Sequence, residues 1–222
     1  MISAILGFAA GSIHVITGPD HLATVSPLAI ENRDKASSIG FKWGIGHTGG
    51  VCLLGFLALA LREIIPLNFI SGYSERIIGI ILIGIGLWGI RKASFNKAHV
   101  HYHEHDGNKH IHFHYHGKEM SHEIPKAHSH THTAFAVGIL HGFAGTSHIF
   151  GILPALAFTS GVDAVLYLLF FGIGTVTAMT AFAFVIGYFS KKLEVKGTVI
   201  IQSMLASFSA AAILIGFYWI LF

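Results

Sequence analysis

The chain has 222 residues, of which 53% are hydrophobic and only 11% are charged, with a mean hydropathy of +0.65 and a formal net charge of +3. A soluble domain carries about 25% charged residues, so this composition excludes an ordinary soluble fold. It indicates an integral membrane protein that crosses the bilayer several times.

Six apolar segments are long enough to cross a bilayer, which requires roughly 17–25 residues. They are predicted at residues 2–29, 38–61, 74–91, 133–158, 163–189 and 198–221. The first follows Met1 without a basic region or a convincing cleavage site, so we expect no cleaved signal peptide. We therefore predict an all-α polytopic membrane protein. Its expected parts are a first three-helix unit (1–92), a His-rich loop (93–132) and a second three-helix unit (133–222).

The lysines and arginines are divided unevenly between the two sides of this predicted topology. Twelve of the 14 fall at the loops after spans one, three and five, and only Arg62 and Arg76 fall on the other side. Because cytoplasmic loops carry an excess of Lys and Arg, the loop 93–132 is predicted to be cytoplasmic and both termini outside. The expected location is a plasma (inner) membrane of the bacterial type.

The first span contains polar residues that are unusual at membrane depth. They are His14, Asp20, His21 and the dipeptide Gly18-Pro19. Ionisable groups in a membrane are costly and mark ion or substrate pathways. In a straight helix two turns would separate His14 from His21 by roughly 10 Å, too far for both to bind one ion. Because proline removes a backbone donor and a broken helix is tolerated where it lines a cavity, we predict an unwound turn at Gly18-Pro19.

A second histidine pair indicates an internal repeat. Residues 14–27 align with residues 141–154, and two histidines, one glycine and one proline fall in register. Shorter glycine-containing matches relate span two to span five and span three to span six. Three spans is an odd number, so the second half must enter the membrane from the opposite side. This predicts a 3+3 inverted-topology repeat with a site at the repeat interface near the midplane.

Span two adds a further histidine within a glycine-rich stretch, Gly44-Ile-Gly46-His47-Thr48-Gly49-Gly50. The glycines permit close helix approach, and we predict His47 as a ligand or as a group that holds a ligand in place. Asp20 would balance the charge of a divalent cation. The predicted membrane metal site therefore consists of His14, Asp20, His21, His47, His141 and His148. Imidazole and carboxylate together suit Ni²⁺, Co²⁺, Zn²⁺ or Fe²⁺ rather than Mg²⁺ or Ca²⁺. The alternative is that these histidines only form hydrogen bonds between helices.

The loop contains twelve of the 17 histidines, and the first eight alternate with other residues. They are His99, His101, His103, His105, His110, His112, His114 and His116. A period of two is typical of a strand, and Gly-Asn is a turn signal. We predict a β-hairpin with its turn at Gly107-Asn108, in which His105 faces His110 and each facing pair can bind a metal such as Zn²⁺ as an accessory site. The alternative is a disordered metal-binding tract. Because a lone hairpin is marginal in water, we expect flexibility without metal.

These motifs resemble those of the nickel/cobalt transporter (NicO) superfamily, in particular its six-span branch of UreH-type and RcnA-like proteins. The resemblance rests on His14-x5-Asp20-His21, on Gly46-His47-Thr48 and on the His-rich loop. The larger permeases have His-x4-Asp-His, which is one residue shorter, and their acidic motif in the second half is replaced here by residues 145–148. The resemblance implies transport of Ni²⁺ or Co²⁺ with no permanent cofactor. It places His14, Asp20, His21 and His47 at the motif positions.

We therefore predict a transporter and not an enzyme. No P-loop is present, so ATP hydrolysis by this chain is not expected, and the single cysteine, Cys52, excludes a CxxC metal or redox site. The expected partners are the metal ion, the lipid bilayer and a metallochaperone or a urease or hydrogenase maturation protein, but no nucleic acid. Two alternatives are a membrane di-metal oxidoreductase of the hydroxylase or desaturase kind, whose His-x2-His-His box is absent, and a metal sensor or storage protein.

Overall fold

The computed structural model describes residues 1–61, 67–95, 99–105, 108–114, 131–143, 153–194 and 197–221. Its α-helices are α1 (Ile2–Thr17), α2 (Pro19–Glu31), α3 (Ala36–Leu61), α4 (Leu67–Phe95), α5 (Thr131–Phe143), α7 (Gly161–Glu194) and α8 (Thr198–Leu221). Two short 3₁₀ helices, η1 (Arg33–Lys35) and η2 (Leu153–Ala157), and two strands, β1 (His99–His105) and β2 (Asn108–His114), complete the described elements.

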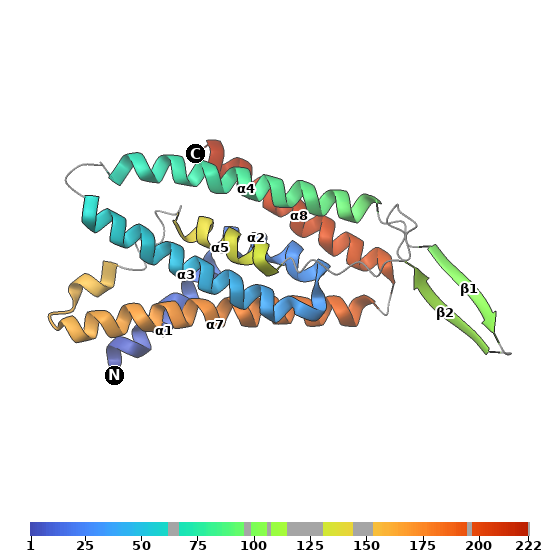
Figure 1. The fold of residues 1–222 in the computed structure, drawn as a ribbon, viewed down its shortest axis with the longest axis horizontal. Coiled ribbons are helices and arrows are strands. Elements are labelled where there is room, and N and C mark those ends of the chain that lie inside the picture. Colours follow the sequence, from blue (N-terminus) through green and yellow to red (C-terminus); the bar gives the residue numbers. More distant parts are fainter. Residues whose placement is uncertain are drawn as a thin grey trace.

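The helices form an elongated bundle, and the two strands project beyond one of its ends (Figure 1). The main packing pairs are α1 with α7, α3 with α5 and α4 with α8, and α3 also packs against α7. Glycines lie where the backbones come closest: a Cβ added to Gly11 would lie 2.0 Å from the carbonyl oxygen of Phe171. Small residues allow such close approach between membrane helices, so glycines at these crossings serve helix packing.

Three described helical segments are long and apolar enough to cross a membrane, namely Arg76–Ser94, Gly161–Glu194 and Thr198–Leu221. The bent pair α1 and α2 is a fourth if both helices are counted as one span. Large apolar side chains such as Ile5 and Leu214 are 65% and 70% exposed, as expected for a surface that faces lipid. The chain is therefore an integral membrane protein. Of the predicted span 133–158, α5 covers the start and η2 lies near the end, and residues 144–152 lie outside the described part.

The strands pair as an antiparallel hairpin in a register that differs from the predicted one. His103 lies opposite His110, and His105 lies opposite Asn108. The prediction that His105 faces His110 was therefore wrong by two residues. Asp-Gly is as strong a two-residue turn signal as Gly-Asn, and this register leaves Asp106 and Gly107 between the strands. Three opposed histidine pairs result, 99 with 114, 101 with 112 and 103 with 110, and His116 lies outside the described residues.

Ion pairs join several helix ends at the end of the bundle from which the hairpin projects (Figure 1). They are Arg33 with Glu194, Lys92 with Glu31, and Lys191 with Asp34. The Lys191 ammonium lies 2.9 Å from the Asp34 carboxylate and lowers the pKa of that carboxyl. These contacts place the carboxyl ends of α2, α4 and α7 side by side, so basic residues of η1, α4 and α7 gather at one end.

Candidate metal site

The centre of the bundle contains a break between α1 and α2. Gly18 has an extended backbone (φ −84°, ψ 99°), and the axes of the two helices differ by 72°. Pro19 occupies the first position of α2, where its missing N–H would have had no partner in the helix anyway. The predicted interruption at Gly18-Pro19 is confirmed by this geometry.

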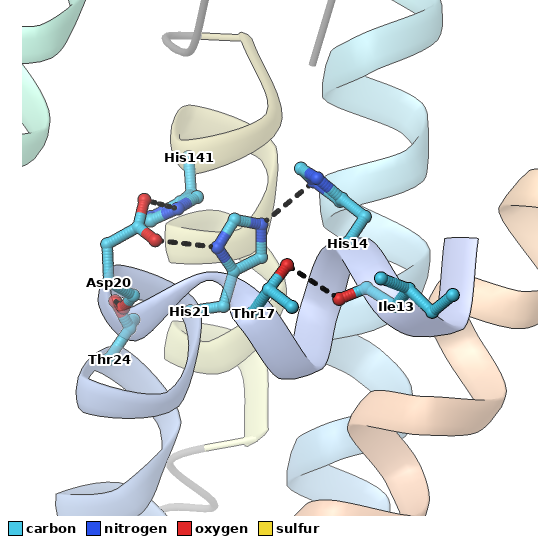
Figure 2. A network of polar contacts seen from close by, with 7 residues as sticks. All are labelled: Ile13, His14, Thr17, Asp20, His21, Thr24 and His141. Carbon is cyan, nitrogen blue, oxygen red and sulfur yellow. Dashed lines mark hydrogen bonds and ion pairs between the residues drawn. The ribbon is translucent and has the colours of Figure 1, made fainter. Parts of the chain in front are cut away.

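The break brings the two histidines of the first span together. The Nε2 atoms of His14 and His21 are 3.1 Å apart (Figure 2), whereas a straight helix would hold these residues roughly 10 Å apart. Two nitrogen ligands about 2.0–2.1 Å from one ion lie about 2.9–3.4 Å from each other. His14 and His21 therefore already have the spacing of two ligands of a single metal ion.

Asp20 contacts two imidazoles at once. Its Oδ1 atom lies 2.9 Å from Nδ1 of His21, and its Oδ2 atom lies 3.1 Å from Nε2 of His141 (Figure 2). A carboxylate can only accept hydrogen bonds, so each of these ring nitrogens donates. A carboxylate on the remaining nitrogen of a metal-binding histidine fixes the tautomer and the ring orientation. Asp20, which is 5% exposed, thus holds two histidine rings in addition to supplying negative charge.

His47 completes a group of three imidazoles. It is fully buried on α3, and its ring centroid lies 4.9 Å from that of His21 and 5.8 Å from that of His14. The ligand atoms that His14, His21 and His47 offer all lie within 4.8 Å of one another. The indole of Trp43 stacks on the His47 ring at 4.8 Å with an interplanar angle of 8°. This stacking fixes the plane of the His47 imidazole.

A second group of three shares one member with the first. Asp20, His21 and His141 are all buried and offer ligand atoms within 4.8 Å of one another. The structure thus brings together five of the six predicted membrane residues, from α1, α2, α3 and α5. His148 lies outside the described residues. The described loop histidines lie on β1 and β2, at the end of the bundle and away from this centre (Figure 1).

Trp43 was not among the site residues predicted from the sequence, and it contacts the rings of His21, His47 and His141. Its centroid lies 5.3–5.4 Å from the rings of His21 and His141. Trp43 precedes His47 by four residues, and such residues share a face of a helix. That spacing is the sequence signal from which the place of Trp43 beside His47 could have been predicted.

Replacing Gly18 with alanine is expected to weaken Co²⁺ binding by roughly 10–100-fold, as other changes to the support of a ligand do. The new Cβ would lie 2.4 Å from Nδ1 of His21 and 3.1 Å from Oδ1 of Asp20, so the hydrogen bond between them must open. Isothermal titration of the purified protein measures the effect. Gly84→Ala is the matched control because its Cβ would meet nothing within 4 Å. Equal affinities of the two variants would contradict this prediction.

Binding of Co²⁺ is expected to quench the fluorescence of Trp43, because its indole stacks directly on one of the proposed ligands. The chain has three tryptophans, so a fluorescence titration of the wild type reports all of them. The quenching should disappear in Trp43→Phe and persist in Trp219→Phe. Quenching of the same size in both variants would show that the ion does not bind next to Trp43.

Comparison with known proteins identifies the family of the chain. The family model described as "Cytochrome C biogenesis protein transmembrane region" matches residues 4–218. The chain belongs to this family. The match covers nearly all of the chain, from the first turn of α1 to the last turn of α8.

Three relatives share parts of the sequence. The chloroplast proteins FOR GROWTH AND FERTILITY 2 and 1 of Arabidopsis thaliana are 39% and 38% identical over 95 residues, which is 42% of this chain and 26% of each relative. The urease accessory protein UreH of Bacillus sp. (strain TB-90) is 32% identical over 144 residues, which is 64% of this chain and 58% of UreH. The alignments therefore span about a quarter of the chloroplast proteins and just over half of UreH. No solved structure matches the chain.

The family differs from the one predicted from the motifs. The matching model is not that of the nickel/cobalt transporter superfamily, and only the UreH-type part of that resemblance is supported, by UreH itself. The motif His14-x5-Asp20-His21 also differs from the permease signature, because it is one residue longer. UreH is named an accessory protein and the family a biogenesis protein, in agreement with the prediction that this chain is not an enzyme.

Proposed function

We propose that this protein transports a divalent transition-metal cation, with Ni²⁺ or Co²⁺ as the preferred substrate, through the site around His21. The observation that supports this most is the convergence of four imidazoles and one carboxylate at a helix break inside a membrane protein. Ionisable groups in this position are costly and mark ion pathways. The similarity to the urease accessory protein UreH is consistent with a role in supplying metal.

The ligand chemistry favours a transition metal. Imidazole nitrogen suits Zn²⁺, Cu²⁺, Ni²⁺, Co²⁺ and Fe²⁺, whereas Mg²⁺ and Ca²⁺ prefer sites made of oxygen ligands. The site offers four histidines and only one acidic residue, Asp20, among the described residues. A hard cation would have to exchange its hydration shell for nitrogen ligands, so Mg²⁺ and Ca²⁺ are poor substrates.

The packing supports a pair of inverted three-helix repeats. Gly11 on α1 approaches the Phe171 carbonyl of α7, and Gly138 on α5 approaches the Trp43 carbonyl of α3. Gly138 is the counterpart of Gly11, 127 positions later, and Phe171 is the counterpart of Trp43, 128 positions later. The repeat therefore relates the contact between Gly11 and Phe171 to the contact between Gly138 and Trp43. A pseudo-two-fold axis in the membrane plane produces this kind of exchange.

A second pair of contacts follows the same rule. Gly174 lies against the carbonyl of Phe8, and Gly46 lies against the carbonyl of Phe135. The helices that correspond to each other, α3 with α7 and α4 with α8, also run in opposite directions (Figure 1). We take α1 with α2, α3 and α4 as the first repeat, and the segment from α5 to η2, α7 and α8 as the second. The metal site then lies between the repeats, where α1, α2 and α3 meet α5.

The basic end of the bundle is the cytoplasmic end in this proposal. Three basic residues form ion pairs with acidic residues at this end, namely Arg33, Lys92 and Lys191. The hairpin extends from the same end. An excess of basic residues is typical of the cytoplasmic side. The alternating histidines of β1 and β2 would act as an accessory site that raises the local metal concentration, with Zn²⁺ as one ion that can bind there.

Metal flux into lipid vesicles tests the proposal. Vesicles containing the purified wild type and an internal metal indicator should take up Co²⁺ and Ni²⁺ with saturation, and should take up Mg²⁺ and Ca²⁺ no faster than protein-free vesicles. A full-length variant with the eight alternating loop histidines changed to asparagine should shift only the concentration dependence. Flux of the wild type equal to that of protein-free vesicles would refute transport by this chain alone.

A further inference from the structure

His21 faces two different sets of ligand atoms with its two ring nitrogens. Its Nε2 lies 3.1 Å from Nε2 of His14, and its Nδ1 lies 2.9 Å from Oδ1 of Asp20. Figure 2 shows the His21 ring between these two partners, with one nitrogen directed at each. A single ion can therefore bind only one nitrogen of His21 at a time.

We propose that the site offers one ion two alternative positions that share His21. In the first position the ligands are His14, His21 and His47, and in the second they are Asp20, His21 and His141. The ion passes from one position to the other by exchanging the nitrogen of His21 that it uses. This inference rests on the proposed transport function and assigns the path of the ion within that site.

The two positions differ in which half of the chain supplies their ligands. The first uses α1, α2 and α3, all of which precede the hairpin. The second adds His141 from α5, which is the described ligand from the second half. Exchange between the positions therefore moves the ion from ligands of one half to ligands shared by both. Such a transfer is what a carrier requires if its two repeats move relative to each other.

The positions are occupied in turn and not together. Two dications on opposite sides of one imidazole would repel each other in a buried environment, where charges are poorly screened. One carboxylate, Asp20, is present to offset that charge among the described ligands. The indole of Trp43 contacts His21, His47 and His141 and forms an apolar wall beside both positions.

The proton balance of the exchange follows from the hydrogen bonds. With the ion in the first position, Nε2 of His21 binds metal, and Nδ1 keeps its proton and donates a hydrogen bond to Asp20. With the ion in the second position, Nδ1 binds metal and the proton resides on Nε2, facing Nε2 of His14. His21 thus changes tautomer, with no net gain or loss of a proton by its ring. Nε2 of His141 donates a hydrogen bond to Asp20 while the ion is in the first position, so if this nitrogen becomes a ligand its proton must move to Nδ1 of the same ring. Both rings then change tautomer, and neither gains or loses a proton. His14, when it no longer binds metal, accepts the hydrogen bond from His21.

The test uses the full-length chain with its loop histidines changed to asparagine, so that Co²⁺ binds at the membrane site. The variant His47→Ala should retain only the second position, and the variant His141→Ala should retain only the first. Each variant should bind one Co²⁺ per chain, and X-ray absorption should find fewer imidazole ligands in His47→Ala than in His141→Ala. Flux into vesicles should fall at least tenfold in both variants although binding persists. His21→Ala should lose binding at both positions.

Two results would overturn the two-position inference. One is loss of Co²⁺ binding in His47→Ala and His141→Ala to the same extent as in His21→Ala, which indicates a single composite site. The other is two Co²⁺ ions bound together in the wild type. If an alanine variant fails to fold, the glutamine variant of the same residue provides the comparison. The two proposals can also fail separately. If the wild type shows no flux but the two variants still differ in their imidazole ligands as predicted, transport is refuted and the two-position inference is retained.

Discussion

The variant His21→Ala is expected to lower saturable Co²⁺ flux by at least about 100-fold, beyond the range of changes that affect only the support of a ligand. His21 belongs to both groups of ligands, and its ring contacts His14 on one side and Asp20 on the other. No neighbouring described side chain takes over both contacts. The flux of reconstituted vesicles, measured with an internal Co²⁺ indicator, gives the result directly.

The control for His21→Ala is His132→Ala. His132 is an exposed histidine near the start of α5, outside the ligand groups, so its loss should leave the flux unchanged. Removing His21 also leaves the buried Asp20 with one imidazole partner fewer, and a buried charge without its partner destabilises a protein. The thermal unfolding temperature of both variants should therefore be measured. Wild-type flux in a folded His21→Ala protein would refute the central role of this residue.

The variant Asp20→Asn is expected to reduce Co²⁺ affinity by roughly 10–100-fold, the usual effect of removing a carboxylate that holds a metal-binding histidine. Asparagine has nearly the same shape, but it has no negative charge and presents an N–H₂ group to one of the two rings. It cannot accept a hydrogen bond from both His21 and His141 as the carboxylate does. Isothermal titration with Co²⁺ measures the change.

Asp34→Asn is the matched control for Asp20→Asn. Asp34 is exposed and pairs with Lys191 at the end of the bundle, so its charge has no part in the ligand groups. The same chemical change there should leave Co²⁺ affinity unaltered. Equal affinity of Asp20→Asn and the wild type would show that the carboxylate neither orients the histidines nor contributes to binding.

Much of the metal site could be predicted from the local sequence. The Gly18-Pro19 dipeptide acts within its own helix, through a missing donor and an extended backbone, so its effect does not depend on distant residues. His14 and His21 lie on either side of that break, and their approach follows from it. The strand pattern of the loop histidines is also local, since it depends only on alternation.

Other features depended on contacts between distant segments. Asp20 contacts His141 because α5 packs against α3, and the sequence predicted the aspartate as a member of the metal site but not its contact with that ring. The register of the hairpin depended on which residues pair across the two strands, and alternation with a period of two does not distinguish registers that differ by two residues. The role of Trp43 required knowledge of which face of α3 meets the other ligands.

The sequence by itself determined that this is a membrane protein, that its first span is broken at Gly18 and that histidines lie at the break, because each of these depends on composition or on neighbouring residues. The sequence predicted that His47 and His141 belong to the same site, but only the tertiary structure brought their rings next to His21 and placed His21 in two groups of ligands. The physical reason is that close approach of α3 to α5 at Gly142, where a Cβ would lie 2.0 Å from the His47 carbonyl, is a property of two helices packed together.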